Sequence, residues 1–133
     1  MNTSGKATFT STAWDEKPYL EIDGGRKLTR VQATFAYSGD LEGEGTVEYL
    51  MAYGPDGTGS FVGLEHITGR IGSRTGSFVA QITGTFDPKS VTTRWEFVPG
   101  LGTEALEGLT GGGNLKLEGH GPYPFTFEYD LPK

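Results

Sequence analysis

The sequence contains no cysteine. This absence excludes a disulfide framework, a thiolate metal site and a cysteine nucleophile. Long apolar runs are absent too, because no segment approaches the roughly 20 apolar residues that a membrane-spanning helix requires. The first residues, 1–6, lack the apolar centre of a signal peptide. We therefore expect a cytoplasmic protein with no membrane partner.

Basic residues are few and scattered along the chain. Lysine and arginine total 11 against 17 acidic residues, and the formal net charge is −6 at pH 7. Proteins that bind nucleic acid present clustered lysine and arginine side chains to the phosphates. The composition therefore argues against a nucleic-acid partner.

The common cofactor and catalytic motifs are missing as well. The chain has no phosphate-binding GxxxxGK[ST] loop, no dinucleotide fingerprint between a strand and a helix, and no GxSxG serine. His66 and His120 lie far apart and do not have the spacing of a metal motif. We expect neither a metal nor an organic cofactor.

Glycine, by contrast, is abundant, and its 22 residues are spread through runs in which apolar and polar side chains alternate. Alternation with a period of two indicates β-strands, and glycines inside strands mark the bulges and bends of a strongly curved sheet. A polar loop is expected at 15–27. The predicted strands are 6–14, 28–38, two within 39–71, 77–86, 90–98, 114–118 and 123–131.

Eight consecutive strands predict an all-β fold in a single domain over residues 1–133. An eight-stranded antiparallel β-barrel is favoured because closure removes the free sheet edges and leaves a lumen for side chains or one small ligand. A β-sandwich is the alternative. Residues 103–109 interrupt the alternation and predict a short helical segment, with Thr103 as its cap and Leu106 and Leu109 on one side.

The turn at 54–57 sets the register of the central hairpin. Pro55 fixes its φ at about −65°, which excludes the first position of a type I′ or II′ turn and favours a type I turn with a bulge at Gly57. This register pairs Val47 with Glu65 and places Glu65 on the apolar face. A slip of one residue would move the carboxylate to the solvent side.

Glu65 is the candidate catalytic residue. Inside a lumen, loss of water would raise the pKa of its carboxyl group and suit it to general acid or base chemistry. The alternative is a buried glutamate with a structural role, hydrogen-bonded by a tyrosine, an arginine or water. Aromatic side chains on the same apolar faces are the candidate ligand-binding residues. They are Tyr49, Tyr53, Phe61, Trp95, Phe97 and Tyr129.

Several short motifs point to one family. They are Trp14-Asp15, Leu28-Thr29, GDLEGEG at 39–45, FVGLE at 61–65, GSFV at 76–79, and Gly102-Thr103 with Leu106 and Gly108-Leu109. On these residues the sequence resembles, over nearly its whole length, the bacterial family catalogued as domain of unknown function 3224. That family resembles the allene oxide cyclase barrel, shared in outline with plant dirigent proteins, which implies an eight-stranded barrel with a lumen. Members of this wider fold cyclise or guide reactive apolar molecules, mainly by shape.

One position departs from the family pattern. The pattern has a histidine after the glutamine of the strand that follows Gly76, whereas here Gln81 is followed by Ile82. The resemblance therefore implies no glutamate–histidine pair in this chain, and Glu65 would act alone or with a tyrosine.

Three functions are compatible with these features. The first is an isomerase or cyclase for a small apolar carbonyl or unsaturated compound, in which Glu65 moves a proton and Tyr49 or Tyr53 orients the oxygen. The second is a barrel that binds a small hydrophobic molecule without chemistry. The third is a structural role with a lumen that is packed shut.

Exterior apolar side chains bear on assembly. The predicted register leaves four of them on the outside of the barrel: Trp14, Leu50, Val62 and Leu64. An exterior apolar patch usually marks an interface, so we expect a homo-oligomer.

Overall fold

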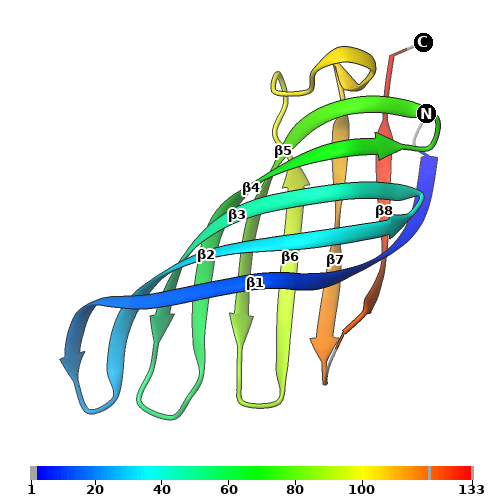
Figure 1. The fold of residues 1–133 in the computed structure, drawn as a ribbon. Coiled ribbons are helices and arrows are strands. Elements are labelled where there is room, and N and C mark those ends of the chain that lie inside the picture. The colour runs from blue at the N-terminus through cyan, green and yellow to red at the C-terminus, as the bar shows by residue number, and fades with distance from the viewer. Residues whose placement is uncertain (1–2, 120, 133) are drawn as a thin grey trace.

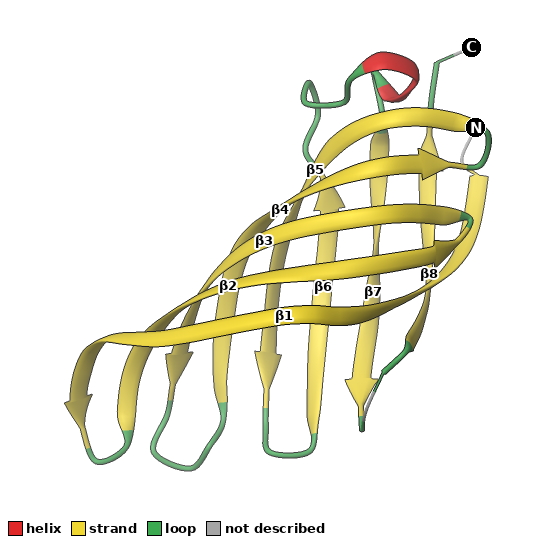
Figure 2. Cartoon of the chain, viewed as in Figure 1, coloured by secondary structure: helices red, strands yellow, loops and turns green. Residues whose placement is uncertain are grey.

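The computed structural model describes residues 3–119 and 121–132, and its strands form one closed antiparallel barrel in sequence order (Figure 1). Within these residues the helical content is one 3-10 turn, η1 (Glu104–Leu106), coloured red in Figure 2. The predicted all-β, eight-stranded antiparallel β-barrel with a short helical segment near 103–109 is confirmed. The strands are β1 (Thr3–Asp23), β2 (Arg26–Gly39), β3 (Leu41–Tyr53), β4 (Gly59–Ile71), β5 (Arg74–Phe86), β6 (Ser90–Phe97), β7 (Thr110–Glu118) and β8 (Tyr123–Asp130).

The two ends of the barrel differ. Figure 1 shows η1 and both chain termini at one end, and the β1–β2, β3–β4 and β5–β6 turns at the other. Leu106 of η1 is fully buried together with Leu41 and Ile71, so η1 closes its end of the barrel. Thr103 is the N-cap residue of this turn, as predicted, but its hydroxyl makes no capping hydrogen bond and instead lies 2.7 Å from the Ser77 hydroxyl.

The register of the β3–β4 hairpin is the predicted one. Val47 pairs with Glu65 and Gly45 with Ile67, and the Gly54 amide donates to the Thr58 carbonyl across the turn at 2.6 Å. Side chains at odd-numbered positions of both strands face the lumen, which explains why Val47 and Ile67 are buried. The same alternation leads each strand to contribute apolar side chains to one continuous core.

Strand β1 is where the sequence prediction fails most clearly. Residues predicted as a polar loop at 15–27 extend β1 to Asp23 and begin β2 at Arg26. A register shift between Ser11 and Ala13 inserts one extra residue, so that Trp14 pairs with the inward-facing Ala33. Trp14 therefore faces the lumen side at the mouth of the barrel, and its predicted place on the outer surface is wrong.

Strand β7 begins earlier than predicted, at Thr110 instead of 114. Gly111 and Gly112 pair with Tyr129 and Glu128 of β8, close to the point where the barrel closes. A Cβ atom at either glycine would collide with the neighbouring backbone, which explains why the run of glycines continues a strand here.

Three of the predicted exterior side chains do lie outside. Leu50, Val62 and Leu64 are each about half exposed on the outer face of β3 and β4, and Leu50 pairs directly with Val62. The homo-oligomer inferred from them stays a prediction, which sedimentation of wild type against Leu64→Glu would test.

Across the described part of the chain, no helix has the length and hydrophobicity needed to span a membrane.

Candidate functional site

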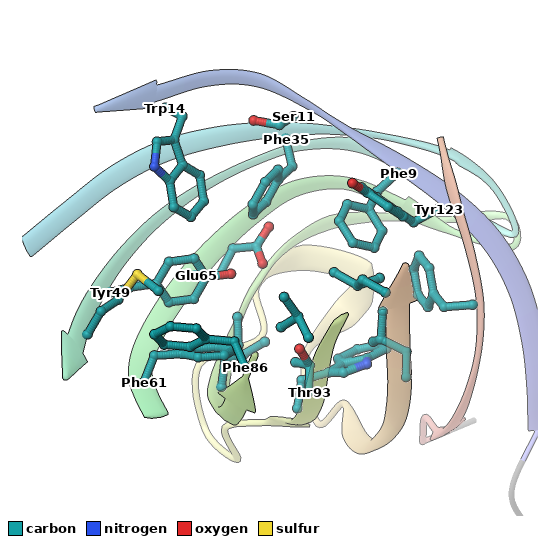
Figure 3. A pocket seen from close by; sticks show the side chains of 18 of the residues that line it. Phe9, Ser11, Trp14, Phe35, Tyr49, Phe61, Glu65, Phe86, Thr93 and Tyr123 are labelled. Carbon is teal, nitrogen blue, oxygen red and sulfur yellow. The ribbon is translucent and has the colours of Figure 1, made fainter. Parts of the chain in front are cut away.

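The lumen holds a cavity of about 580 Å³ (Figure 3). It extends to the end of the barrel that carries the turns, because Gly57 and Asp87 are part of its lining. Sites for small molecules in proteins commonly measure roughly 300–1,000 Å³ and are mostly apolar. The lumen is therefore not packed shut and has room for one small molecule.

Glu65 brings a carboxyl group into this cavity. It lies in the middle of β4, is only 3% exposed, and Figure 3 shows its carboxyl group directed into the lumen. Its neighbours across the sheet are Val47 on β3 and Ala80 on β5, both buried and apolar. A carboxyl group so placed has lost nearly all contact with water.

Tyr37 of β2 is the hydrogen-bond partner that the described residues provide for this carboxyl group. Its hydroxyl donates to Glu65 Oε2 at 2.5 Å. The two side chains meet across β3, where Tyr37 pairs with Gly43, Glu65 pairs with Val47, and Gly45 is the inward-facing position between these two. Because Gly45 carries no side chain, the Tyr37 hydroxyl of β2 and the Glu65 carboxyl group of β4 can meet over the strand that separates them.

Gly45 also makes room for the carboxyl group itself. A Cβ atom at this position would collide with Glu65 Oε2, so the carboxyl group lies against the bare backbone of β3. The absence of a side chain at Gly45 thus lets the carboxyl group lie close to β3, within hydrogen-bonding distance of the Tyr37 hydroxyl.

Burial changes the ionisation of Glu65 and of two nearby tyrosines, Tyr37 and Tyr49. Loss of water raises the pKa of Glu65 to about 7, an effect that the Tyr37 hydrogen bond opposes. Burial first, and then the nearby charge of Glu65, raises the pKa of Tyr37 and of Tyr49 well above the usual range for tyrosine. Near neutral pH both tyrosines are neutral, and Glu65 is close to the midpoint of its titration.

Four of the predicted ligand-binding residues line the cavity: Tyr49, Tyr53, Phe61 and Trp95. The rings of Tyr49 and Phe61 meet edge to face at 5.3 Å and form one wall. The Trp95 indole N–H is buried without a partner among the described residues, and it points towards β7, since a Cβ at Gly113 would lie 3.4 Å from Nε1.

The other two, Phe97 and Tyr129, lie outside the cavity lining, in contrast to the prediction. Phe97 is buried between Phe78 and Trp95, at ring-centroid distances of 5.0 and 5.1 Å. Tyr129 packs beside Phe127 at 5.6 Å. Alternation assigns both residues to the inner face correctly, but other rings fill the lumen at their level.

A second carboxylate, Glu16, stands at the mouth. It accepts hydrogen bonds from Thr29 at 2.7 Å, from Trp14 Nε1 at 3.2 Å, and from the Tyr53 hydroxyl. Burial raises the pKa of Glu16, but these three hydrogen bonds and the charge of Lys27 outweigh it and leave the pKa below its usual range. Burial and the Glu16 contact raise the pKa of Tyr53 to about 12.

Two features of the site were missed by sequence reasoning. Glu16 was placed in a loop because Pro18, Asp23, Gly24 and Gly25 gave residues 15–27 the composition of one. A tyrosine was considered as a partner of Glu65, but its identity as Tyr37 was not foreseen. The second had a usable signal: Gly45 is an inward-facing position of β3, and a glycine there leaves side chains of the two neighbouring strands free to meet. Ile82, where the family resemblance led us to expect a histidine, lines the cavity as an apolar side chain.

Among residues 3–119 and 121–132, no three histidine, aspartate or glutamate side chains are grouped so as to hold a metal ion.

Comparison with known proteins agrees with this architecture. No curated protein matches the sequence. A crystal structure at 1.84 Å of a protein of unknown function from the DUF3224 family of Shewanella oneidensis MR-1 superimposes with a TM-score of 0.82, at 26% sequence identity and over 100% of both chains. The family described as protein of unknown function (DUF3224) matches residues 5–129. The chain belongs to the DUF3224 family.

Proposed function

We propose that this barrel binds a small, largely apolar molecule in its lumen, with Glu65 as the polar anchor. The observation that carries the proposal is the aromatic-lined cavity of about 580 Å³ with one deeply buried carboxyl group facing it. A purely structural core would be more stable with an apolar residue at this position, because burying an unpaired carboxylate opposes folding.

Binding can be tested with a neutral fluorescent probe, N-phenyl-1-naphthylamine, whose emission rises in apolar surroundings. Ala80 lines the cavity beside Glu65, so Ala80→Phe places a ring in the lumen. Thr83→Phe adds the same ring to the exposed outer face of the same strand and is the matched control. We expect saturable binding by wild type and Thr83→Phe, and affinity weakened about tenfold or more in Ala80→Phe, which corresponds to roughly 1.4 kcal/mol.

Two results would contradict the proposal. One is an absence of saturable enhancement with wild type. The other is equal binding by wild type and Ala80→Phe when thermal unfolding shows that the variant is folded.

A second candidate function is proton transfer, and the ionisation of Glu65 favours it. A carboxyl group with a pKa of about 7 exists in both forms at neutral pH, as a general acid–base group requires. In a β,γ-unsaturated ketone, the Glu65 carboxylate would take the proton from the carbon between carbonyl and alkene. The same proton would return to the γ-carbon, and the Tyr49 hydroxyl would donate to the enolate oxygen meanwhile. The net change is an isomerisation that needs no oxidant or cofactor.

Cyclohex-3-enone tests this candidate, since its conjugated isomer absorbs in the ultraviolet. Glu65→Gln should lower the rate by about 10²- to 10⁴-fold, the usual contribution of a general acid–base group. The Thr83→Phe variant should keep the wild-type rate. Equal rates for wild type, Glu65→Gln and buffer would exclude proton transfer on this class of ketone.

The predicted likeness to the allene oxide cyclase barrel adds to this second candidate by fold alone and stays a prediction.

A further inference from the structure

The charges around the cavity are unbalanced. Among the described residues of the lining, the formally charged side chains are Glu65 and Asp87, and lysine, arginine and histidine are absent from it. Asp87 lies at the mouth and stays ionised, because backbone amides of Lys89 and Ser90 donate to its carboxylate and hold its pKa below the usual range. An anion in the lumen would therefore meet like charge and no counter-ion.

The walls near Glu65 are also electron-rich. Phe9, Phe35, Tyr49 and Phe61 line the cavity around it, and Figure 3 shows their rings grouped about the carboxyl group. The faces of aromatic rings carry partial negative charge and attract cations, most strongly where water is excluded. Rings of this kind surround quaternary ammonium groups in other binding sites.

The hydrogen bonds at the Glu65 carboxyl group point the same way. The Tyr37 hydroxyl already donates its single hydrogen to Glu65, so it cannot also donate to a ligand carbonyl. Ionised Glu65 is an acceptor only and would repel a carbonyl oxygen. Within the described residues the second carboxylate oxygen, Oε1, has no hydrogen-bond donor and is available to a cation.

We propose that the lumen selects a lipophilic cation: an apolar molecule with one ammonium group, placed between the Glu65 carboxylate and the surrounding ring faces. This inference rests on the proposed binding function and names the class of ligand. A cation would bind best to the ionised form of Glu65, a preference that a neutral apolar molecule would not share.

The groups that face Glu65 allow the pH dependence of ligand binding to be assigned to Glu65 itself. Tyr37 on β2 and Tyr49 on β3 stay neutral, since burial holds the pKa of both far above neutrality. Among the lining residues of β1, β5 and β8, Phe9, Ala80 and Phe125 carry no ionisable group, and the titratable one on β8 is the phenol of Tyr123.

At the mouth, Glu16 and Asp87 keep their charge because the pKa of each is lowered. Lys27 lies 4.8 Å from the centre of the Tyr53 ring, and the charge of Lys116 acts on Asp87. Between pH 5 and 9, Glu65 is therefore, among the described residues of the cavity lining, the group that changes charge.

Three matched probes test the inference by NMR titration of the Ala80 and Ile82 methyl groups. They are benzyltrimethylammonium, its neutral carbon isostere neopentylbenzene, and the anion phenylacetate. At pH 8.5 we expect the cation to bind about tenfold or more tightly than the isostere, and phenylacetate to bind weakest. On lowering the pH to 5, the affinity for the cation should fall about tenfold or more, because protons compete for Glu65.

Glu65→Gln should remove this preference. In the variant, the cation and neopentylbenzene should bind with similar affinity, and the pH dependence should disappear. The pH series on wild type gives the same information if the variant does not fold. Binding of the cation should also lower the pKa of Glu65, which the carboxyl-carbon resonance reports independently.

The outcomes separate the two proposals. If neopentylbenzene binds as tightly as the cation or more tightly at pH 8.5, the inference is wrong while lumen binding stands. If the cation binds equally well at pH 5 and 8.5, Glu65 is not its partner and the inference is again wrong. If none of the three probes, nor N-phenyl-1-naphthylamine, perturbs the lumen resonances, the proposed binding function fails as well.

Discussion

Glu65 in the lumen and Glu16 at the mouth each accept a hydrogen bond from a tyrosine hydroxyl, yet their pKa values move in opposite directions. Glu65 has one donor, Tyr37, and is almost completely buried. Glu16 has three donors, lies partly in water, and senses the charge of Lys27. Each site has a tyrosine donor, so the difference between the two pKa values comes from burial and from the number of hydrogen-bond donors.

This contrast divides the barrel into two functional regions. The mouth holds a permanent negative charge that orients Trp14 and Tyr53, the two aromatic residues that flank the entrance. The lumen holds a group whose charge responds to protons near neutral pH and to whatever enters the cavity. Of these two carboxyl groups, Glu65 is the one whose charge can change near neutral pH when a ligand binds or a proton is transferred.

The largest effect is expected for Glu65→Gln. A folded-state pKa of about 7, against an ordinary value of 4.5, means that the contribution of Glu65 to stability is fully present below pH 4.5 and is lost as the pH rises through 7. The difference corresponds to roughly 3 kcal/mol. Relative to wild type, the variant should therefore gain about that much stability between pH 4 and 8, as urea unfolding measures at each pH. A constant difference across this range would contradict the buried, titrating carboxyl group.

Next in size is the removal of the tyrosine hydroxyls. Tyr37→Phe leaves the buried carboxylate without its donor and should cost about 1–3 kcal/mol at pH 8, with a further rise in the pKa of Glu65. Tyr53→Phe is the matched control at the mouth, where Thr29 and Trp14 still donate to Glu16. Its effect on the free energy of unfolding should be smaller. Equal losses in the two variants would remove the distinction between lumen and mouth.

Gly45→Ala comes third. The added methyl group collides with Glu65 Oε2 and should move the carboxyl group away from Tyr37, at a cost of about 1 kcal/mol. The pKa of Glu65 should rise, as a carbon-13 titration would show. Thr46→Ala, on the exposed face of the same strand, should leave that pKa unchanged. An unchanged pKa in Gly45→Ala would show that the glycine does not position the carboxyl group.

The smallest effect is expected for Glu16→Gln, and its pH dependence has the opposite sign. Because the folded-state pKa of Glu16 is lowered, its contribution is present above its unfolded-state pKa and is lost as the pH falls through the folded-state pKa. For a group this exposed, the contribution is below about 1 kcal/mol. Wild type and variant should therefore differ at pH 7 and converge in acid, as unfolding at pH 3 and 7 would measure. Divergence towards acid would contradict the assignment.

Whether a feature could be predicted from the sequence depends on whether the interactions that determine it are local in the chain. Regular alternation and the turn around Pro55 are local, and they were enough to predict the barrel and the pairing of Val47 with Glu65. The bulge after Ser11 is a backbone irregularity without a sequence pattern of its own, and it reversed the predicted facing of Trp14. Glu16 was missed because the composition of residues 15–27 predicted a polar loop.

Contacts across the lumen were harder still to predict. Tyr37 reaches Glu65 over Gly45 of the strand between them, a contact that depends on how strongly the barrel curves. Phe97 was assigned to the correct face, but its position along the barrel axis decides whether it lines the cavity or the packed core. Alternation predicts which face of a strand a residue lies on and carries no information about its position along the axis.

The most direct test of the contrast between lumen and mouth is a carboxyl-carbon NMR titration that follows Glu65 and Glu16 in the same sample. The variants Glu65→Gln and Glu16→Gln assign the two resonances. We expect a pKa of about 7 for Glu65 and a value below the usual range for Glu16. A Glu65 pKa near 4.5 would show that its carboxyl group is hydrated or paired with a cation, and the lumen would then not be the desolvated binding site proposed here.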